Sequence, residues 1–167
     1  MKGVFAAMRI KGLTGQQIEQ YLTEALLILM ETKPYDKISI GEVAQKAGVN
    51  RSSYYRHFSS KEDILRFYLM SIMQEYQAAY QQGPEQTFYA YTRQIFVTFY
   101  AHRHDLLLIH KNGLSYLLLD VLNTCFRLTD PEQQLTEKEQ FKLSYHIGGI
   151  YNNMRLWLAH GMAETPD

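Results

Sequence analysis

The chain has 167 residues, enough for one compact core or for two small ones that share an interface. Hydrophobic residues make up 46% of it, which excludes wholesale disorder, and no apolar run reaches the roughly 18 residues that a membrane span needs. A single cysteine, Cys125, excludes an intramolecular disulfide, and the N-terminus lacks the pattern of a secretion signal, so we expect a cytoplasmic protein.

The net charge of the chain is zero, but the charges are unevenly distributed. Residues 1–66 hold ten basic and seven acidic side chains, whereas residues 67–167 hold seven basic and ten acidic ones. A basic front half is suited to binding a polyanionic partner such as DNA, and an acidic back half is suited to a part of the protein that does not contact the DNA. The asymmetry is small, so it indicates a nucleic-acid partner only weakly.

The front half of the sequence predicts four helices. In the first, apolar residues recur at every third or fourth position until Lys33-Pro34, and the residue before a proline avoids helical geometry. Ser39 with Glu42 three residues later predicts a capping box, and Gly48 supplies the left-handed conformation that ends the second helix. The expected helices cover residues 14–32, 40–47, 50–58 and 60–82. Their expected caps are Thr14 or Gly15, then Ser39, Asn50 and Ser60.

The back half predicts four more helices and no strands, so the expected fold class is all-α. Thr136 with Glu139 predicts another capping box at the start of the last helix. The fifth helix is rich in aromatic residues, and the last carries apolar residues along most of its length. The expected ranges are 85–101, 104–111, 114–127 and 136–161.

Ser39 to Lys61 is the segment that carries a functional pattern. Two short helices joined by so short a glycine turn must cross steeply, as in a helix-turn-helix. No acidic residue occurs between Val43 and Lys61, and the second helix offers arginine, hydroxyl and histidine donors of the kind that grip base edges and phosphates in a major groove. The spacing alone leaves open a helical hairpin with a merely solvated basic face.

The segment from Ile38 to Leu65, ISIGEVAQKAGVNRSSYYRHFSSKEDIL, resembles the DNA-binding domain of the TetR family of bacterial regulators. The resemblance implies that Tyr54 and Phe58 are buried core residues. It also implies phosphate contacts at Tyr55, His57 and Lys61 and base or backbone contacts at Arg51, Ser52 and Arg56. The full set of expected DNA-binding residues is Ser39, Arg51, Ser52, Ser53, Tyr55, Arg56, His57 and Lys61.

The same resemblance implies the domain organisation. An N-terminal three-helix helix-turn-helix domain, residues 1–65, would be joined by the long fourth helix to a C-terminal helical regulatory and dimerisation domain, residues 66–167. The back half resembles a short C-terminal type seen in regulators near dihydroxyacetone kinase operons. The residues that suggest this are His102-Arg103, Leu106-Leu107, Gly148-Gly149, Trp157 and Gly161.

A homodimer is expected because reading a palindromic operator in double-stranded DNA needs two copies about one DNA turn apart. The expected interface residues are Gly148, Gly149, Met154 and Trp157, with the open alternative that they pack inside one subunit. The candidate lining of an effector pocket is Phe96, Tyr100, Tyr116, Tyr145 and Tyr151, although an aromatic stripe at helical spacing is more often core.

The expected function is that of a sequence-specific repressor released from its operator by a small-molecule effector. The alternative is a regulator without such a ligand, controlled by a protein partner or acting as an activator. An enzyme is disfavoured because no nucleophile–base pair, paired carboxylates or phosphate-binding loop occurs at useful spacing. No cofactor is expected, and no metal either, because His102, His104 and His110 lack carboxylate or cysteine partners at ligand spacing. The sequence names neither operator nor effector.

Overall fold

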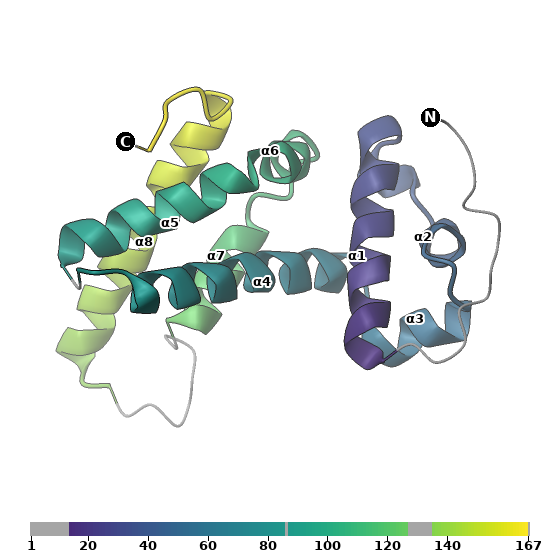
Figure 1. Ribbon diagram of the computed structural model, residues 1–167, viewed down its shortest axis with the longest axis horizontal. Helices are drawn as coiled ribbons and strands as arrows, with labels where there is room; N and C mark the ends of the chain where they lie inside the picture. The colour runs from purple at the N-terminus through teal and green to yellow at the C-terminus, as the bar shows by residue number, and fades with distance from the viewer. Residues whose placement is uncertain (1–13, 86, 127–134, 167) are drawn as a thin grey trace. The chain divides into compact units, whose positions relative to one another are not determined.

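The computed structural model describes residues 14–85, 87–126 and 135–166. Within these ranges the chain forms eight α-helices, one short 3₁₀ helix and no strand, which confirms the all-α expectation (Figure 1). None of the helices in the described ranges is long and apolar enough to cross a membrane. The chain packs as two compact units, one ending at Phe67 and the other beginning at Tyr68. The boundary lies within helix α4 (Lys61–Gln82), and each unit is described by itself.

The first unit is built from α1 (Gly15–Thr32), the 3₁₀ helix η1 (Tyr35–Lys37), α2 (Ile40–Lys46), α3 (Arg51–His57) and the first turns of α4. Helix α1 packs against both α2 and α3, which also pack against each other. Thr14 caps α1 as expected, because its side chain accepts a hydrogen bond from the Gln17 amide. The core of this unit includes Leu22, Leu26, Ile38, Val43, Tyr54, Phe58, Ile64 and Leu65.

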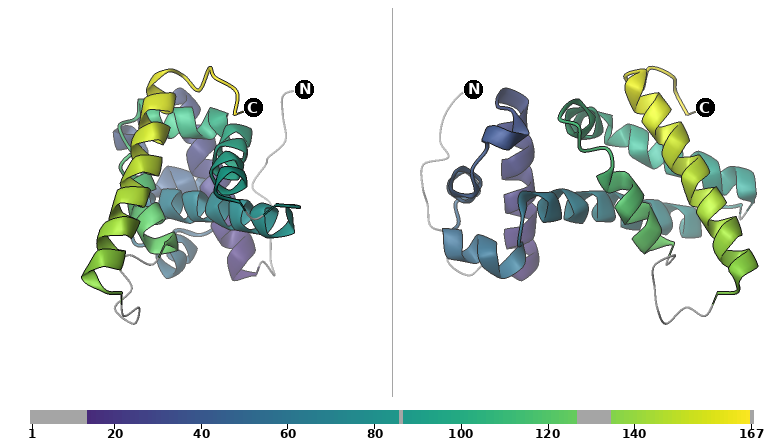
Figure 2. Two further views of the ribbon diagram at one scale, coloured as in Figure 1. Left: turned by 90° about the vertical axis from the view of Figure 1, so that its left-hand side faces the viewer. Right: turned by 180° about the vertical axis from the view of Figure 1, so that it is seen from behind.

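The second unit holds the rest of α4 with α5 (Phe88–Ala101), α6 (Arg103–Lys111), α7 (Leu117–Cys125) and α8 (Glu137–Ala159). Helix α8 packs against α6 and α7 and lies beside α7 when seen from behind (Figure 2). Helix α5 begins three residues later than predicted, because Thr87 is its N-cap and accepts a hydrogen bond from the Ala90 amide at 3.1 Å. Helix α7 is shorter than the predicted 114–127, and Arg127 lies outside the described residues.

Within the second unit, a polar network ties α4 to the junction of α5 and α6. The Tyr68 hydroxyl donates to Asp105 Oδ2 at 2.7 Å and lies 3.2 Å from His102 Nδ1. His102 Nε2 lies 2.8 Å from Glu75 Oε2. Burial, with the neighbouring Asp105 carboxylate, raises the pKa of Tyr68, so this hydroxyl stays protonated and able to donate.

Candidate nucleic-acid interface

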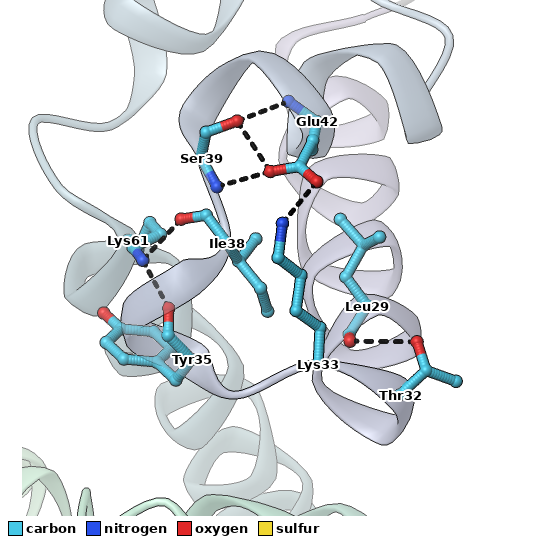
Figure 3. Close-up of polar contacts among 8 residues, drawn as sticks. All are labelled: Leu29, Thr32, Lys33, Tyr35, Ile38, Ser39, Glu42 and Lys61. Carbon is cyan, nitrogen blue, oxygen red and sulfur yellow. Dashed lines mark hydrogen bonds and ion pairs between the residues drawn. The ribbon is translucent and has the colours of Figure 1, made fainter.

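The start of α2 is fixed by the capping box that the sequence predicts. Ser39 Oγ accepts a hydrogen bond from the Glu42 amide, and Glu42 Oε2 accepts bonds from the Ser39 amide at 2.8 Å and the Ser39 hydroxyl at 2.7 Å (Figure 3). The other carboxylate oxygen, Oε1, lies 2.6 Å from Lys33 Nζ. The Lys33 bond, followed by the bonds from Ser39, lowers the pKa of Glu42 to about 2. Glu42 is therefore ionised throughout the physiological range.

The turn between α2 and α3 depends on the backbone of Gly48. Its φ of 69° lies in the left-handed region that residues with a Cβ rarely adopt, although a Cβ there would meet no neighbouring atom. The turn is closed by the Val49 amide, which donates to the Ala44 carbonyl at 3.0 Å. Conformation rather than crowding thus requires glycine at this position.

Helix α3 is anchored by aromatic packing on its inner side. Tyr54 is completely buried and Phe58 is buried, as expected. The Phe58 ring makes an edge contact with Phe67, with ring centroids 5.8 Å apart, and lies 6.4 Å from the Tyr54 ring. Asn50 occupies the N-cap position as expected, although its side chain makes no capping hydrogen bond.

The outer face of α3 carries Arg51, Ser52, Tyr55 and Arg56, all exposed. Arg51 Nη2 donates to the Tyr55 hydroxyl at 3.1 Å, and its guanidinium carbon lies 5.6 Å from the centre of the Tyr55 ring. This pairing orients the arginine along the helix surface while leaving other guanidinium N–H groups for an incoming acceptor. Ser39, at the start of α2, is exposed as well.

Ser53 does not lie on this outer face. Its exposed fraction is 7%, because it shares the inner side of α3 with Tyr54 where α3 packs on α1 and α2. Its hydroxyl accepts a hydrogen bond from Arg56 Nη2 at 3.0 Å. The expectation that Ser53 faces outward is therefore wrong, and in this structure the residue serves to orient Arg56.

His57 is likewise turned inward, toward α1. Its Nδ1 lies 3.1 Å from Glu19 Oε1, and only 18% of its side chain is exposed. A Cβ added at Gly15 would lie 3.2 Å from His57 Cε1, so the glycine makes room for the imidazole ring. The histidine joins the end of α3 to the first turns of α1, which the short-range pattern around residues 54–58 does not indicate.

Lys61, the first residue of α4, is also engaged inside the unit. Its ammonium donates to the carbonyl oxygens of Tyr35 and Ile38, each at 2.6 Å, and lies 4.2 Å from the centre of the Tyr35 ring (Figure 3). Burial lowers the pKa of Lys61. Of the eight predicted DNA-binding residues, five lie at the surface: Ser39, Arg51, Ser52, Tyr55 and Arg56. Ser53 is buried and bonds Arg56 of its own helix, whereas His57 and Lys61 are turned toward neighbouring elements.

The match of the chain to a known family lies within this first unit. Residues 22–66 match the family model of bacterial regulatory proteins, tetR family. These residues are thus similar to the tetR-family domain that the model describes. The match supports a DNA-binding transcription regulator, and it includes α2, the Gly48 turn and α3 in full. No curated protein matches the chain.

The tetR-family match ends before the second unit. None of the five candidate pocket residues there, Phe96, Tyr100, Tyr116, Tyr145 and the half-buried Tyr151, lines the hollow described below. Phe96 and Tyr100 pack on Trp157 of α8, with ring centroids 5.4 Å and 5.7 Å away, so they belong to packing between helices. Tyr116 and Tyr145 are exposed. A half-open hollow of about 310 Å³ lies instead at the end of α4 and the start of α5, and its lining includes Tyr80, Glu85, Tyr89 and Arg93.

The candidate interface residues on α8 fall on two opposite faces. Met154 and Trp157 are buried, and Trp157 Nε1 also donates to the Glu164 carbonyl at 2.9 Å, so both residues pack inside their own unit. The expectation that they form an intersubunit surface is wrong for this reason. Gly149 is exposed and Gly148 is half-buried.

Among the described residues no cluster of histidine, cysteine and carboxylate side chains could hold a metal ion.

Proposed function

We propose that this protein is a sequence-specific DNA-binding transcription regulator that acts as a homodimer on a palindromic operator in the cytoplasm. The observation that carries the proposal is the outer face of α3 in the tetR-family domain. This face presents Arg51, Ser52, Tyr55 and Arg56 in a stretch without acidic residues. A helix of this kind fits the major groove of B-DNA, where arginine bonds guanine and hydroxyl groups reach bases or phosphates.

The contacts divide by the orientation of the side chains. Arg51, at the first position of α3, is the best candidate for reading a base, because recognition helices meet base edges with their N-terminal residues. Tyr55 supports Arg51 through its hydroxyl and is itself 53% exposed, which suits a backbone contact. Ser39 is exposed at the start of α2 and suits a phosphate contact from the other side of the turn.

Replacing Arg51 tests the proposal. Arg51→Ala should weaken binding to the operator by about 1–3 kcal/mol and relax the preference at one base pair, because a bidentate contact to a base is lost. Fluorescence anisotropy with a labelled operator, selected by the wild-type protein from a random duplex library, and with a random duplex measures both effects. Lys111→Ala is the control, since it removes one exposed positive charge from the second unit. Equal losses on operator and random DNA would contradict base reading by Arg51.

The second unit supplies a candidate dimer surface on α8. Phe141, Tyr145 and Leu156 are exposed, Gly148 and Gly149 follow Tyr145 by three and four positions, and Leu156 lies seven positions, about two helical turns, beyond Gly149 on the same face. Phe141 and Tyr145 are exposed by 73% and 87%, which is unusual for large rings unless another surface covers them. Small residues in the middle of the stripe would let two such helices approach closely. We therefore assign the dimer contact to this face.

The proposal extends to control of DNA binding by a small molecule that releases a repressor. The hollow near Tyr80 and Tyr89 supports this part, since its volume falls at the lower end of the range for ligand sites and its lining combines tyrosine rings with charged groups. We also propose that the second unit is a regulatory domain of the short C-terminal type that its sequence resembles. Control by a protein partner, or activation, is the alternative, and a reporter fused to the operator's promoter separates repression from activation when the gene is deleted.

A further inference from the structure

His102 lies at the point where α4, α5 and α6 meet within the second unit. It is the single residue between α5 and α6, so it occupies the C-cap position of one helix and the N-cap position of the other. Its ring makes an edge contact with the Tyr68 ring of α4, with centroids 6.0 Å apart, and its side chain is 27% exposed. The contacts of this ring therefore determine how the α5–α6 junction is attached to α4.

The hydrogen bonds around the ring show where its protons must be. Tyr68 has one hydroxyl proton, and it donates this proton to Asp105 Oδ2 at 2.7 Å. The Tyr68 oxygen is thus left to accept a bond from His102 Nδ1, 3.2 Å away. On the other side of the ring, His102 Nε2 lies 2.8 Å from Glu75 Oε2, and a carboxylate can only accept. Both ring nitrogens therefore face acceptors, and only the doubly protonated imidazolium donates from both.

We propose that His102 is a pH-sensitive latch, which as an imidazolium bonds both Tyr68 and Glu75 of α4 and on losing a proton gives up one of these two bonds. This inference goes beyond the proposed DNA-binding function and does not depend on it. Histidine is suited to the role because its charge ordinarily changes between about pH 5 and pH 8. A neutral ring has one N–H group, so its other nitrogen would turn a lone pair toward an oxygen that has no proton to give.

The charged groups that face the latch come from α4 and α6. Glu75 of α4 meets the ring directly, and Asp105 of α6 lies one hydrogen bond further along the same chain of contacts. The second oxygen of Asp105 lies 3.0 Å from Nδ1 of His104, whose side chain is 73% exposed. Arg103 stacks on the Tyr100 ring of α5, with its guanidinium carbon 4.8 Å from the ring centre. The imidazolium thus lies between two carboxylates, and a neutral ring would leave them without this positive charge between them.

The direction of the pH effect follows from the number of bonds. The folded protein offers the imidazolium two acceptors that the unfolded chain does not hold in place, whereas the neutral ring uses only one of them. The latch therefore stabilises the second unit at about pH 5.5 and loses this effect as the pH rises toward about pH 8.5. A ring that served only to fill space would stabilise the unit equally across this range.

Trp157 provides a probe of the second unit alone. It is the only tryptophan in the chain, it is buried, and its ring stacks on Tyr100 of α5 at a centroid distance of 5.7 Å. Thermal unfolding of the whole protein, followed by the fluorescence of this residue, is measured at several pH values between about pH 5.5 and pH 8.5. The melting temperature then reports the stability of the unit that holds the latch.

Two variants and a matched control separate the latch from packing. His102→Gln keeps a polar side chain that cannot take up a proton in this range, and Glu75→Gln keeps the histidine but removes the charge that faces Nε2. His160→Gln is the control, because His160 belongs to the same unit and its Nδ1 lies 3.0 Å from the exposed Glu164 carboxylate. Each variant is compared with the wild type at the same pH, so that the effects of groups common to both proteins cancel.

The latch predicts that His102→Gln lowers the melting temperature by about 2–4 °C at about pH 5.5 and that this difference closes toward about pH 8.5. Glu75→Gln should show a smaller difference with the same trend, because Nδ1 remains bonded to Tyr68. His160→Gln should stay within about 1 °C of the wild type throughout, since an exposed pair contributes little.

A His102→Gln difference that stays constant or grows with rising pH would overturn the latch, as would an equal trend in His160→Gln. If His102→Gln did not fold, the trend in Glu75→Gln would decide in the same way, because the Glu75 side chain is 55% exposed and its replacement leaves the core intact.

Discussion

Tyr54 shows how one side chain anchors α3, the proposed recognition helix. The residue is completely buried and makes an edge contact with the neighbouring Tyr55 ring, with centroids 5.2 Å apart. Its hydroxyl has no hydrogen-bond partner among the described residues. Burial raises the pKa of Tyr54 to about 12, so the hydroxyl stays neutral. The ring therefore stabilises the unit, whereas the hydroxyl was taken out of water without compensation.

Removing this hydroxyl should stabilise the protein. Tyr54→Phe keeps the ring and is expected to raise the free energy of unfolding by about 1 kcal/mol, because an unpaired buried polar group is lost. Urea denaturation followed by circular dichroism measures the change. Tyr55→Phe is the control, since its hydroxyl is exposed and pairs with Arg51, and we expect it to be nearly neutral. A loss of stability in Tyr54→Phe would mean that the hydroxyl is paired.

At the scale of elements, the capping boxes decide where helices begin. Glu42 at α2 and Glu139 at α8 each accept hydrogen bonds from the backbone amide and hydroxyl of the cap residue. Both carboxyl groups have a lowered pKa, but Glu42 alone of the two is held by Lys33, whose bond is the largest cause of its shift. The two capping boxes thus have the same hydrogen bonds to the cap residue, and they differ in the ion pair between Lys33 and Glu42.

The ion pair makes the first unit sensitive to acid. Because folding lowers the pKa of Glu42 from 4.5 to about 2, its stabilising effect is complete above pH 4.5 and is lost as the pH falls toward 2. Glu42→Gln should therefore lower the free energy of unfolding at pH 7, and the difference from the wild type should shrink between pH 5 and pH 3. Urea titrations at several pH values measure this. Glu139→Gln should show a smaller difference at pH 7, and a Glu42→Gln difference that does not vary with pH would contradict the assignment.

At the scale of the whole molecule, the exposed face of α8 carries the proposed dimer. Tyr145→Lys places a charge in the middle of this stripe and should weaken self-association by at least about tenfold, since a charge buried in an apolar interface is costly. Light scattering coupled to size-exclusion chromatography measures the oligomeric state. Tyr55→Lys is the control, because it makes the same change at an exposed tyrosine of α3. A Tyr145→Lys protein that stays dimeric would place the interface elsewhere.

Helix α8 also shows where sequence patterns stop being informative. Its periodicity does not say which apolar residues face inward, because both faces of the helix carry them. Trp157 and Met154 turned out to be core, whereas Tyr145 and Leu156 lie on the exposed face. The packing of α8 against α6 and α7 determines which of its apolar residues face inward. The spacing of those residues along the sequence does not show where the neighbouring helices lie.

The sequence by itself determined the features that depend on local interactions. Capping boxes, the proline stop after α1 and the left-handed glycine at position 48 each involve residues within a few positions of one another, so the helix-turn-helix could be predicted from residues 38–65. Only the tertiary structure decided which groups His57 and Lys61 contact within the first unit. Their partners Glu19, Tyr35 and Ile38 lie 38, 26 and 23 residues away, and such pairings exist only once the helices have packed.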